Sequence, residues 1–227
     1  MHNKSTRNII IYGSGGLGRG IIELVHSINM TADEQWKIQG IIDDYNDNNV
    51  YEYPYLGDIK YLLNLQKRTY IVIAFGNPRI KYEKYQLLKR NKNLLFPNLI
   101  HPSVSLPQTL SIGKGNIISS GVSLSADVKI GNFNLIHFNS TIGHDVLIEN
   151  YNSIYPLTSL SGYVHVHNGV EVGSNATIIP SKSVKDNSIV GAGSVVLENV
   201  EVNQIVAGVP SRIIKLKNRN NNEIDYN

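Results

Sequence analysis

Every sixth residue from Ile100 to Val202 is isoleucine, leucine or valine, and the series has no gap. An α-helix repeats every 3.6 residues and an ordinary strand every 2, so neither produces a strict period of six. A parallel β-helix does, because its short strands wind into flat faces and one aliphatic side chain per face points towards the axis. Three such hexads per triangular coil predict roughly six coils over residues 100–207.

The other positions of the hexad agree with this fold. The residue after the aliphatic one is often glycine. The fifth residue is small or β-branched, which suits a crowded, strand-like corner, at Val104, Val122, Val128, Val146, Thr158, Val164, Val170, Ala176 and Val200. The alternative, an all-β sandwich, would need turn clusters about every 8–12 residues and a broken phase. The unbroken phase favours the β-helix.

Charge and cysteine content exclude several functions. The net charge of +3, from 21 Lys+Arg and 18 Asp+Glu, is too balanced to indicate nucleic-acid binding. Four basic residues gather near the end, where a solvated tail is the simpler interpretation: Arg212, Lys215, Lys217 and Arg219. The lack of cysteine excludes disulfides, thiolate metal sites and a thiol nucleophile. We expect a cytoplasmic protein, because neither a signal peptide nor a membrane-spanning stretch is recognisable.

The first hundred residues alternate between strand-like and helical patterns. Strands are predicted at 8–12, 37–42, 70–74 and 94–99, and helices at 20–28, 58–65 and 79–91. The stretch 45–57 is expected to be irregular. Alternating strands and helices indicate a small parallel sheet covered by helices.

A glycine motif lies where the first strand turns into the first helix. Gly13-x-Gly15-x-x-Gly18 lets the backbone approach a phosphate closely, and the helix N-terminus offers free N–H groups. The acidic residue of a dinucleotide site, expected about 20 positions later, is missing. We therefore favour a half-site that binds a nucleotide or nucleotide-sugar, through Gly13, Ser14, Gly15 and Gly16. NAD binding and a purely structural turn are the alternatives.

Polar residues also follow two other predicted strands. Asp43 and Asp44 end the second strand, and Gly76-Asn77 ends the third. Ligands of open α/β sheets gather at the carboxyl ends of the strands. These four residues are therefore expected to contact the same ligand.

His144-Asp145 interrupts the chemistry of the repeat. Ile142 fills its core position, so His144 is expected at the surface where a strand meets a corner. Asp145 could orient the imidazole, and a histidine near neutral pKa can accept a proton from an amine or hydroxyl that attacks a carbonyl carbon. The simpler alternative is a solvent-exposed corner histidine.

The remaining histidines of the repeats allow a different interpretation. His137, His165 and His167 could contribute to a metal site shared across a trimer interface, as in β-helical carbonic anhydrases. Their separations do not match the ligand spacing of that class. No metal is therefore expected.

Taken together, the motifs of the chain resemble one family. They are the Gly-Ser-Gly-Gly turn, Ile42-Asp-Asp44, Ala74-Phe-Gly-Asn77, Asn98-Leu-Ile-His-Pro102, Ile142-Gly-His-Asp145 and Ala207-Gly-Val-Pro-Ser-Arg212. The family is the left-handed β-helix sugar acetyltransferases with an N-terminal Rossmann-like half-domain. It includes enzymes that make bacillosamine and related 4-amino-sugars, and the sialic acid O-acetyltransferase type. The likeness spans residues 7–216.

This resemblance implies a fold, a reaction and an assembly. Residues 1–97 would be an α/β Rossmann-like domain that binds a nucleotide-sugar, 98–211 a left-handed parallel β-helix, and 212–227 a tail. His144 would be the general base and Asp145 would raise its basicity. Acetyl-CoA would lie between neighbouring β-helices of a homotrimer, against Ser153, Gly162, Gly173, Ala192, Gly208 and Pro210. The N–H of Gly162 would contact the thioester oxygen.

Two positions depart from the bacillosamine-type members, and two further functions stay open. Leu17 stands where those members have a substrate-contacting histidine, and Ser153 where they have a cofactor-contacting one. The leading prediction is N-acetylation of a nucleotide-linked 4-amino-dideoxy sugar for surface glycans. The alternatives are O-acetylation of sialic acid or another sugar, and a non-enzymatic trimeric scaffold that binds nucleotides.

Overall fold

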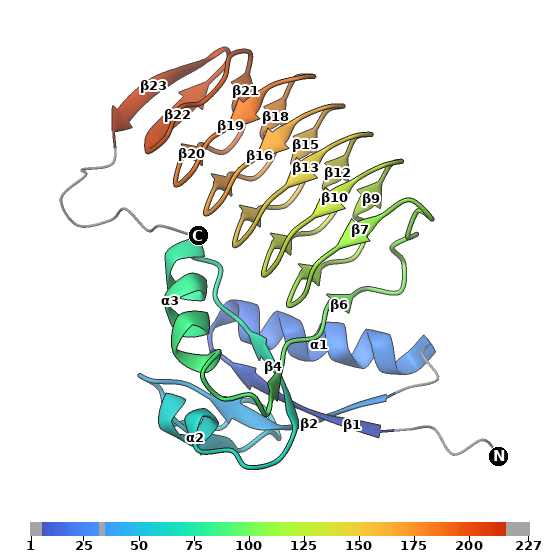
Figure 1. The fold of residues 1–227 in the computed structure, drawn as a ribbon, viewed down its shortest axis with the longest axis vertical. Helices are drawn as coiled ribbons and strands as arrows, with labels where there is room; N and C mark the ends of the chain where they lie inside the picture. The colour runs from blue at the N-terminus through green and yellow to red at the C-terminus, as the bar shows by residue number, and fades with distance from the viewer. Residues whose placement is uncertain (1–5, 32–34, 217–227) are drawn as a thin grey trace. The chain divides into compact units, whose positions relative to one another are not determined.

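The structure is a computed structural model that describes residues 6–31 and 35–216. Its contacts divide the chain into two units, Met1–Gly76 with Ile80–Pro102, and Asn77–Arg79 with Ser103–Asn227. The first is an α/β domain and the second a left-handed parallel β-helix, so both predicted fold classes are confirmed (Figure 1).

The α/β domain is built on a five-stranded parallel sheet with strand order β3-β2-β1-β4-β5. The strands are β1 (Thr6–Tyr12), β2 (Gln35–Ile42), β3 (Tyr55–Gly57), β4 (Thr69–Ile73) and β5 (Leu94–Leu95). The helices are α1 (Gly16–Thr31), α2 (Ile59–Leu63) and α3 (Pro78–Leu88). The second halves of the central strands β1 and β4 are apolar and buried, and Ile9, Ile11 and Ile71 have no exposed surface. A sheet buried on both faces favours such continuous aliphatic runs.

Strand β3 lies in a stretch that was expected to be irregular. It has only three residues and carries no apolar alternation, so its sequence gives no periodic signal. It forms because Gly40 lets the chain come close: a Cβ there would lie 2.5 Å from the Pro54 carbonyl oxygen. The backbone pairing of Ile41 with Tyr55 then extends the sheet.

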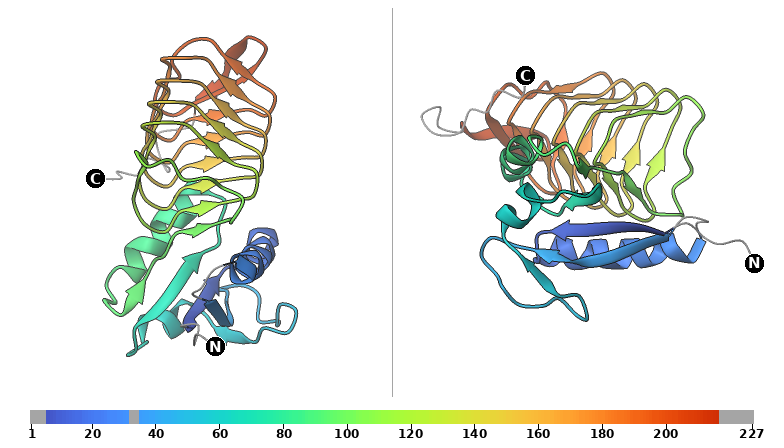
Figure 2. Two further views of the ribbon diagram at one scale, coloured as in Figure 1. Left: turned by 90° about the vertical axis from the view of Figure 1, so that its right-hand side faces the viewer. Right: turned by 60° about the horizontal axis from the view of Figure 1, so that its bottom comes forward.

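The β-helix has three flat faces, which we name A, B and C (Figure 2). Face A holds β7 (Ser111–Ile112), β10 (Lys129–Ile130), β13 (Leu147–Ile148), β16 (His165–Val166) and β19 (Ser183–Val184). Face B holds β8 (Ile117–Ile118), β11 (Leu135–Ile136), β14 (Ser153–Ile154), β17 (Glu171–Val172), β20 (Ile189–Val190), β22 (Gln204–Gly208) and the antiparallel β23 (Ser211–Leu216). Face C holds β9 (Ser123–Leu124), β12 (Thr141–Ile142), β15 (Ser159–Leu160), β18 (Thr177–Ile178) and β21 (Val195–Val196). The short β6 (Leu99–Ile100) precedes these coils.

The aliphatic series forms the core through the middle of the β-helix and fails at both ends. From Ile130 to Val196 each sixth residue is at most 3% exposed. Leu106 is 50% exposed and Val202 is 47% exposed, so predicting them as core residues was wrong. At the C-terminal end the pairing step shortens: Ile154 pairs with Val172, but Val190 pairs with Val206. On face A, Val184 likewise pairs with Val200, which is 1% exposed, so Val200 is buried where the period would place Val202.

A second period of six concerns the backbone at the corners. The fourth residue of each hexad has a positive φ at Asp127, Phe133, Asn139, Asp145, Tyr151, Leu157, Tyr163, Asn175, Ser181 and Asn187, and at Gly115, Gly121, Gly169 and Gly193. This conformation costs an ordinary L-residue about 1–2 kcal/mol, and glycine, asparagine and aspartate tolerate it best. Corners between faces A and B, B and C, and C and A are named AB, BC and CA below.

The end of the chain differs from a simple solvated tail. Ser211–Leu216 forms β23, which pairs antiparallel with β22 and carries Arg212 and Lys215. Lys217, Arg219 and the rest of 217–227 lie outside the described residues.

Candidate active site

His144 and Asp145 lie together on corner CA, directly after β12. Ile142 is 2% exposed, so the strand is anchored in the core, while the His144 side chain is 55% exposed. His144 Nδ1 lies 2.9 Å from Asp145 Oδ2. Asp145 has φ 57°, the positive-φ conformation of the corner. A hydrogen bond from Nδ1–H to the carboxylate leaves Nε2 with a lone pair that faces away from Asp145.

The ring of His144 rests on the next coil. A Cβ on Gly162 would lie 2.6 Å from His144 Nε2, so the glycine leaves the space that the ring fills. The Tyr163 ring meets the imidazole edge-on with centroids 5.0 Å apart. Within the described residues, the N–H of Gly162 donates no hydrogen bond. The structure therefore brings three predicted residues together: His144, Asp145 and Gly162.

The other residues predicted to contact the cofactor lie on a different corner. Gly173 and Ala192 follow β17 and β20 on corner BC, and a Cβ on Gly173 would meet the Ala192 nitrogen at 2.4 Å. The Gly208 N–H donates to Ser194 Oγ at 3.2 Å, and Pro210 is exposed between β22 and β23. A single β-helix therefore does not bring these four residues to His144.

Ser153 was also predicted to contact the cofactor. It lies in β14 on face B, apart from corner CA, and is buried. Its cofactor contact stays a prediction. The prediction rested on the position of a histidine in related sequences, which carries no information about burial in this chain.

In the α/β domain the structure joins Ser14 to Asp43. The N–H and the hydroxyl of Ser14 each donate to Asp43 Oδ2 at 2.8 Å. The backbone N–H groups of Tyr45 and Asn46 donate to Oδ1. Burial alone would raise the pKa of Asp43, but these four hydrogen bonds outweigh it and hold that pKa below its usual value. The carboxylate is thus occupied in joining β2 to the turn after β1.

Asp44 takes part in a separate network. It accepts from the Tyr12 hydroxyl at 2.5 Å, from Lys84 Nζ at 2.6 Å and from the Ile59 N–H at 3.0 Å. Burial would raise the pKa of Asp44, and the hydrogen bonds from Lys84 and Tyr12 lower it overall. Burial and the nearby Asp44 both raise the pKa of Tyr12. Tyr12 and Lys84 were not predicted: Tyr12 reads as a core strand residue, and nothing in the sequence around Lys84 points to Asp44.

The glycines of the motif divide into two kinds. A Cβ on Gly13 would lie 2.8 Å from the Ala74 carbonyl oxygen, and one on Gly18 would lie 2.0 Å from the Gly13 carbonyl oxygen. These two are required by packing. A Cβ on Gly15 would meet nothing within 4 Å, and one on Gly16 would only reach the Arg19 side chain at 4.0 Å. The open space above Gly15 and Gly16 lies at the N-terminus of α1.

The last two predicted substrate residues, Gly76 and Asn77, lie between β4 and α3. Gly76 follows the carboxyl end of β4, where Ala74 approaches Gly13. Asn77 directly precedes α3. Across the described part of the chain, no helix is both long and apolar enough to cross a membrane.

Comparison with known proteins identifies relatives of both units. The family described as the PglD N-terminal domain matches residues 8–88. PerB from Caulobacter crescentus, solved with CoA and GDP-perosamine, is 27% identical with a TM-score of 0.82, over 92% of this chain and 97% of that one. The acetyltransferase domain of PglB from Neisseria gonorrhoeae has the same fold, with 24% identity and a TM-score of 0.85, over 92% of this chain and 100% of that one.

Matches to curated sequences are shorter. Galactoside O-acetyltransferase from Escherichia coli is 40% identical over 52 residues, which is 23% of this chain. The chain spans about a quarter of that relative's length (26%). Together, the PglD-type N-terminal domain, the hexapeptide β-helix and the likeness to PerB over 92% of the chain support the resemblance to the hexapeptide-repeat sugar acetyltransferases with an N-terminal Rossmann-like domain.

Proposed function

We propose that this protein transfers the acetyl group of acetyl-CoA to the amine of a nucleotide-linked 4-amino-dideoxy sugar, for the synthesis of surface glycans. The observation that carries the proposal is the His144–Asp145 pair, whose ring rests on Gly162. The likeness to PerB, solved with CoA and GDP-perosamine, supports the two substrates.

The geometry of corner CA supports a direct transfer. His144 Nε2 accepts a proton from the amine as the amine nitrogen attacks the thioester carbon. The N–H of Gly162, which has no other acceptor within the described residues, stabilises the oxyanion. The carbonyl re-forms as the carbon–sulfur bond breaks, and coenzyme A leaves as a thiol with the proton that His144 accepted. Because the chain contains no cysteine, a cysteinyl intermediate is excluded.

The separation of the predicted residues supports a homotrimer. The base lies on corner CA, whereas Gly173, Ala192 and Gly208 gather at corner BC. A cofactor that contacts both sets would lie between two copies of the chain, and closed three-fold symmetry would repeat this contact three times. Both corners carry exposed apolar side chains: Phe138 is 43% exposed, Leu157 56% and Tyr163 58%.

The α/β domain would bind the nucleotide. Gly15 and Gly16 leave open space at the N-terminus of α1, where free N–H groups attract phosphate. Gly13, Ser14 and Asp43 would act indirectly, since their contacts hold the turn in shape.

A sugar hydroxyl is the alternative acceptor. The short match to galactoside O-acetyltransferase favours it. A scaffold without activity is the third possibility, and it predicts no thermal stabilisation by acetyl-CoA.

The deciding experiment follows thiol release with acetyl-CoA and a panel of nucleotide 4-amino-sugars, galactosides and sialic acids. We expect turnover with a nucleotide amino-sugar, and a loss of about 10²- to 10⁴-fold in His144→Ala. His26→Gln, which removes an imidazole from α1, serves as the control and should keep its turnover. Near-normal turnover of His144→Ala would contradict the assignment of the base.

A further inference from the structure

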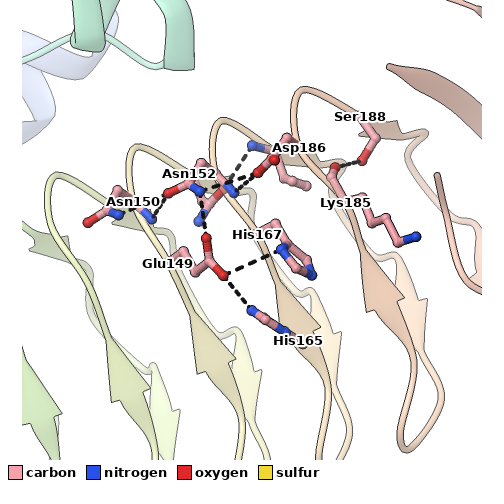
Figure 3. Close-up of polar contacts among 10 residues, drawn as sticks. Glu149, Asn150, Asn152, His165, His167, Lys185, Asp186 and Ser188 are labelled. Carbon is pink, nitrogen blue, oxygen red and sulfur yellow. Dashed lines mark hydrogen bonds and ion pairs between the residues drawn. The ribbon is translucent and has the colours of Figure 1, made fainter. Parts of the chain in front are cut away.

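Corner AB carries a cluster of ligand-type side chains that the proposed reaction does not use. Glu149 follows β13, and His167 follows β16 at the equivalent position one coil later. His165 and His167 flank the fully buried Val166, so both side chains point outward from the same face. Figure 3 shows the two rings converging on the carboxylate.

The three side chains meet at one carboxylate oxygen. His165 Nε2 lies 2.7 Å from Glu149 Oε1, and His167 Nδ1 lies 3.4 Å from the same atom. Only the first of these is a hydrogen bond. All three ligand atoms lie within 4.8 Å of one another. The hydrogen bond to Glu149 therefore accounts for the position of the His165 ring. No hydrogen bond to Glu149 accounts for the position of the His167 ring.

The Glu149 carboxylate is also held by the amide of Asn168. Asn168 Nδ2 donates to Glu149 Oε2 at 2.5 Å, and the same amide contacts Asp186 Oδ1. Polar partners behind the ligands are typical of metal sites, because they fix the direction of each ligand. The cluster is accessible to solvent, since its three side chains are 27–30% exposed.

The two imidazole rings of the cluster lie against each other. They are stacked with centroids 3.7 Å apart. Lys185, on the next coil, is paired with Glu201 at 2.6 Å. In Figure 3 its side chain points away from the cluster.

We propose that Glu149, His165 and His167 bind a divalent transition-metal ion, Zn²⁺, which ties two neighbouring coils together at corner AB. Two imidazole nitrogens and one carboxylate oxygen are a known zinc ligand set, with a fourth position left for water. The site is separate from His144, which lies on corner CA. Histidine spacings alone do not point to this cluster, because its third member is a glutamate placed there by the coil repeat.

The test uses the full chain, stripped with a chelator and titrated with Zn²⁺ alone by calorimetry and with Co²⁺ by visible absorption. We expect one ion per chain, and a melting temperature raised by about 5 °C or more at a hundredfold excess over Kd. Glu149→Gln, His165→Ser and His167→Gln should each weaken binding about tenfold or more. His165→Ser introduces the residue that already stands at the equivalent position, Ser183, so it is the variant best placed to fold normally.

Two matched variants separate this site from other histidines. His144→Gln and His26→Gln each remove one imidazole elsewhere, and both should bind Zn²⁺ like the unaltered protein. Substoichiometric binding by the unaltered chain would overturn the proposal. So would unchanged affinity in His165→Ser and His167→Gln, provided that each melts as one cooperative transition without metal.

Discussion

At the scale of single residues, Asp145 has two roles that can be separated. Its carboxylate holds His144 Nδ1 at 2.9 Å, and its backbone has the positive φ of the corner. Asparagine tolerates that conformation nearly as well as aspartate, whereas alanine does not.

We therefore expect Asp145→Asn to fold with almost unchanged stability while its kcat falls about tenfold or more, because the imidazole loses its charged partner. Asp145→Ala should lose a similar factor in kcat and about 1–2 kcal/mol of stability as well. Steady-state kinetics and thermal unfolding of the two variants check this. Equal stability of both would show that the corner does not strain an alanine.

Gly162 gives a second prediction for a single residue. A Cβ there would lie 2.6 Å from His144 Nε2, so Gly162→Ala must push the ring aside. Because a displacement of about 1 Å can cost about a hundredfold in rate, we expect such a loss of kcat with folding retained. Gly20→Ala, where a Cβ meets nothing within 4 Å, is the control and should keep full activity. Full activity in Gly162→Ala would mean that the ring position does not matter.

At the scale of elements, the turn from β1 to α1 combines packing with an open surface. Gly18→Ala would place a Cβ 2.0 Å from a backbone oxygen that cannot move away. We expect it to destabilise the protein by about 3 kcal/mol or more.

Gly15→Ala should change stability by less than about 0.5 kcal/mol and yet raise the KM for the nucleotide-sugar about tenfold, because the methyl group blocks the phosphate. Denaturant unfolding and kinetics test both variants, and an unchanged KM in Gly15→Ala would argue against binding at this turn.

The link between β2 and this turn predicts a dependence on pH. Hydrogen bonds hold the pKa of Asp43 below its unfolded value of 3.8. The stabilisation is therefore present above that pH and is lost as the pH falls towards the folded-state pKa. Asp43→Asn should cost about 1–3 kcal/mol at neutral pH, and this cost should decrease steadily as the pH falls below 3.8. Asp127→Asn, at an exposed corner, is the control, and a cost for Asp43→Asn that does not depend on pH would contradict this account.

The elements also show what a sequence can and cannot predict. The six-residue period predicts the β-helix, because one side chain per face must point inward at each turn. It does not predict the end of the period at Val202, where Val184 pairs with Val200 and the last coil is two residues shorter. The His144–Asp145 contact was predictable because the two residues are adjacent. The contact of Lys84 with Asp44 joins residues 40 positions apart, and only the folded sheet brings them together.

At the scale of the whole molecule, the proposed chemistry requires more than one copy of the chain. The base and Gly162 are on corner CA, whereas Gly173, Ala192 and Gly208 are at corner BC, so a monomer would hold half of each site. The proposed metal cluster lies on corner AB, which leaves it outside that arrangement. Under these proposals, corner CA carries the base, corner BC carries most of the cofactor contacts and corner AB carries the metal site.

We expect sedimentation to give about three times the chain mass of 25.2 kDa. Leu157→Asp should weaken this assembly and lower turnover in parallel, because it places a charge on an exposed apolar corner while aspartate tolerates the φ of 63° there. Met30→Gln, which removes an exposed apolar side chain from α1, should leave both unchanged. An active monomer would contradict the trimer and require all cofactor contacts to come from one chain. Loss of turnover in a Leu157→Asp protein that still sediments as a trimer would instead place Leu157 in contact with the cofactor.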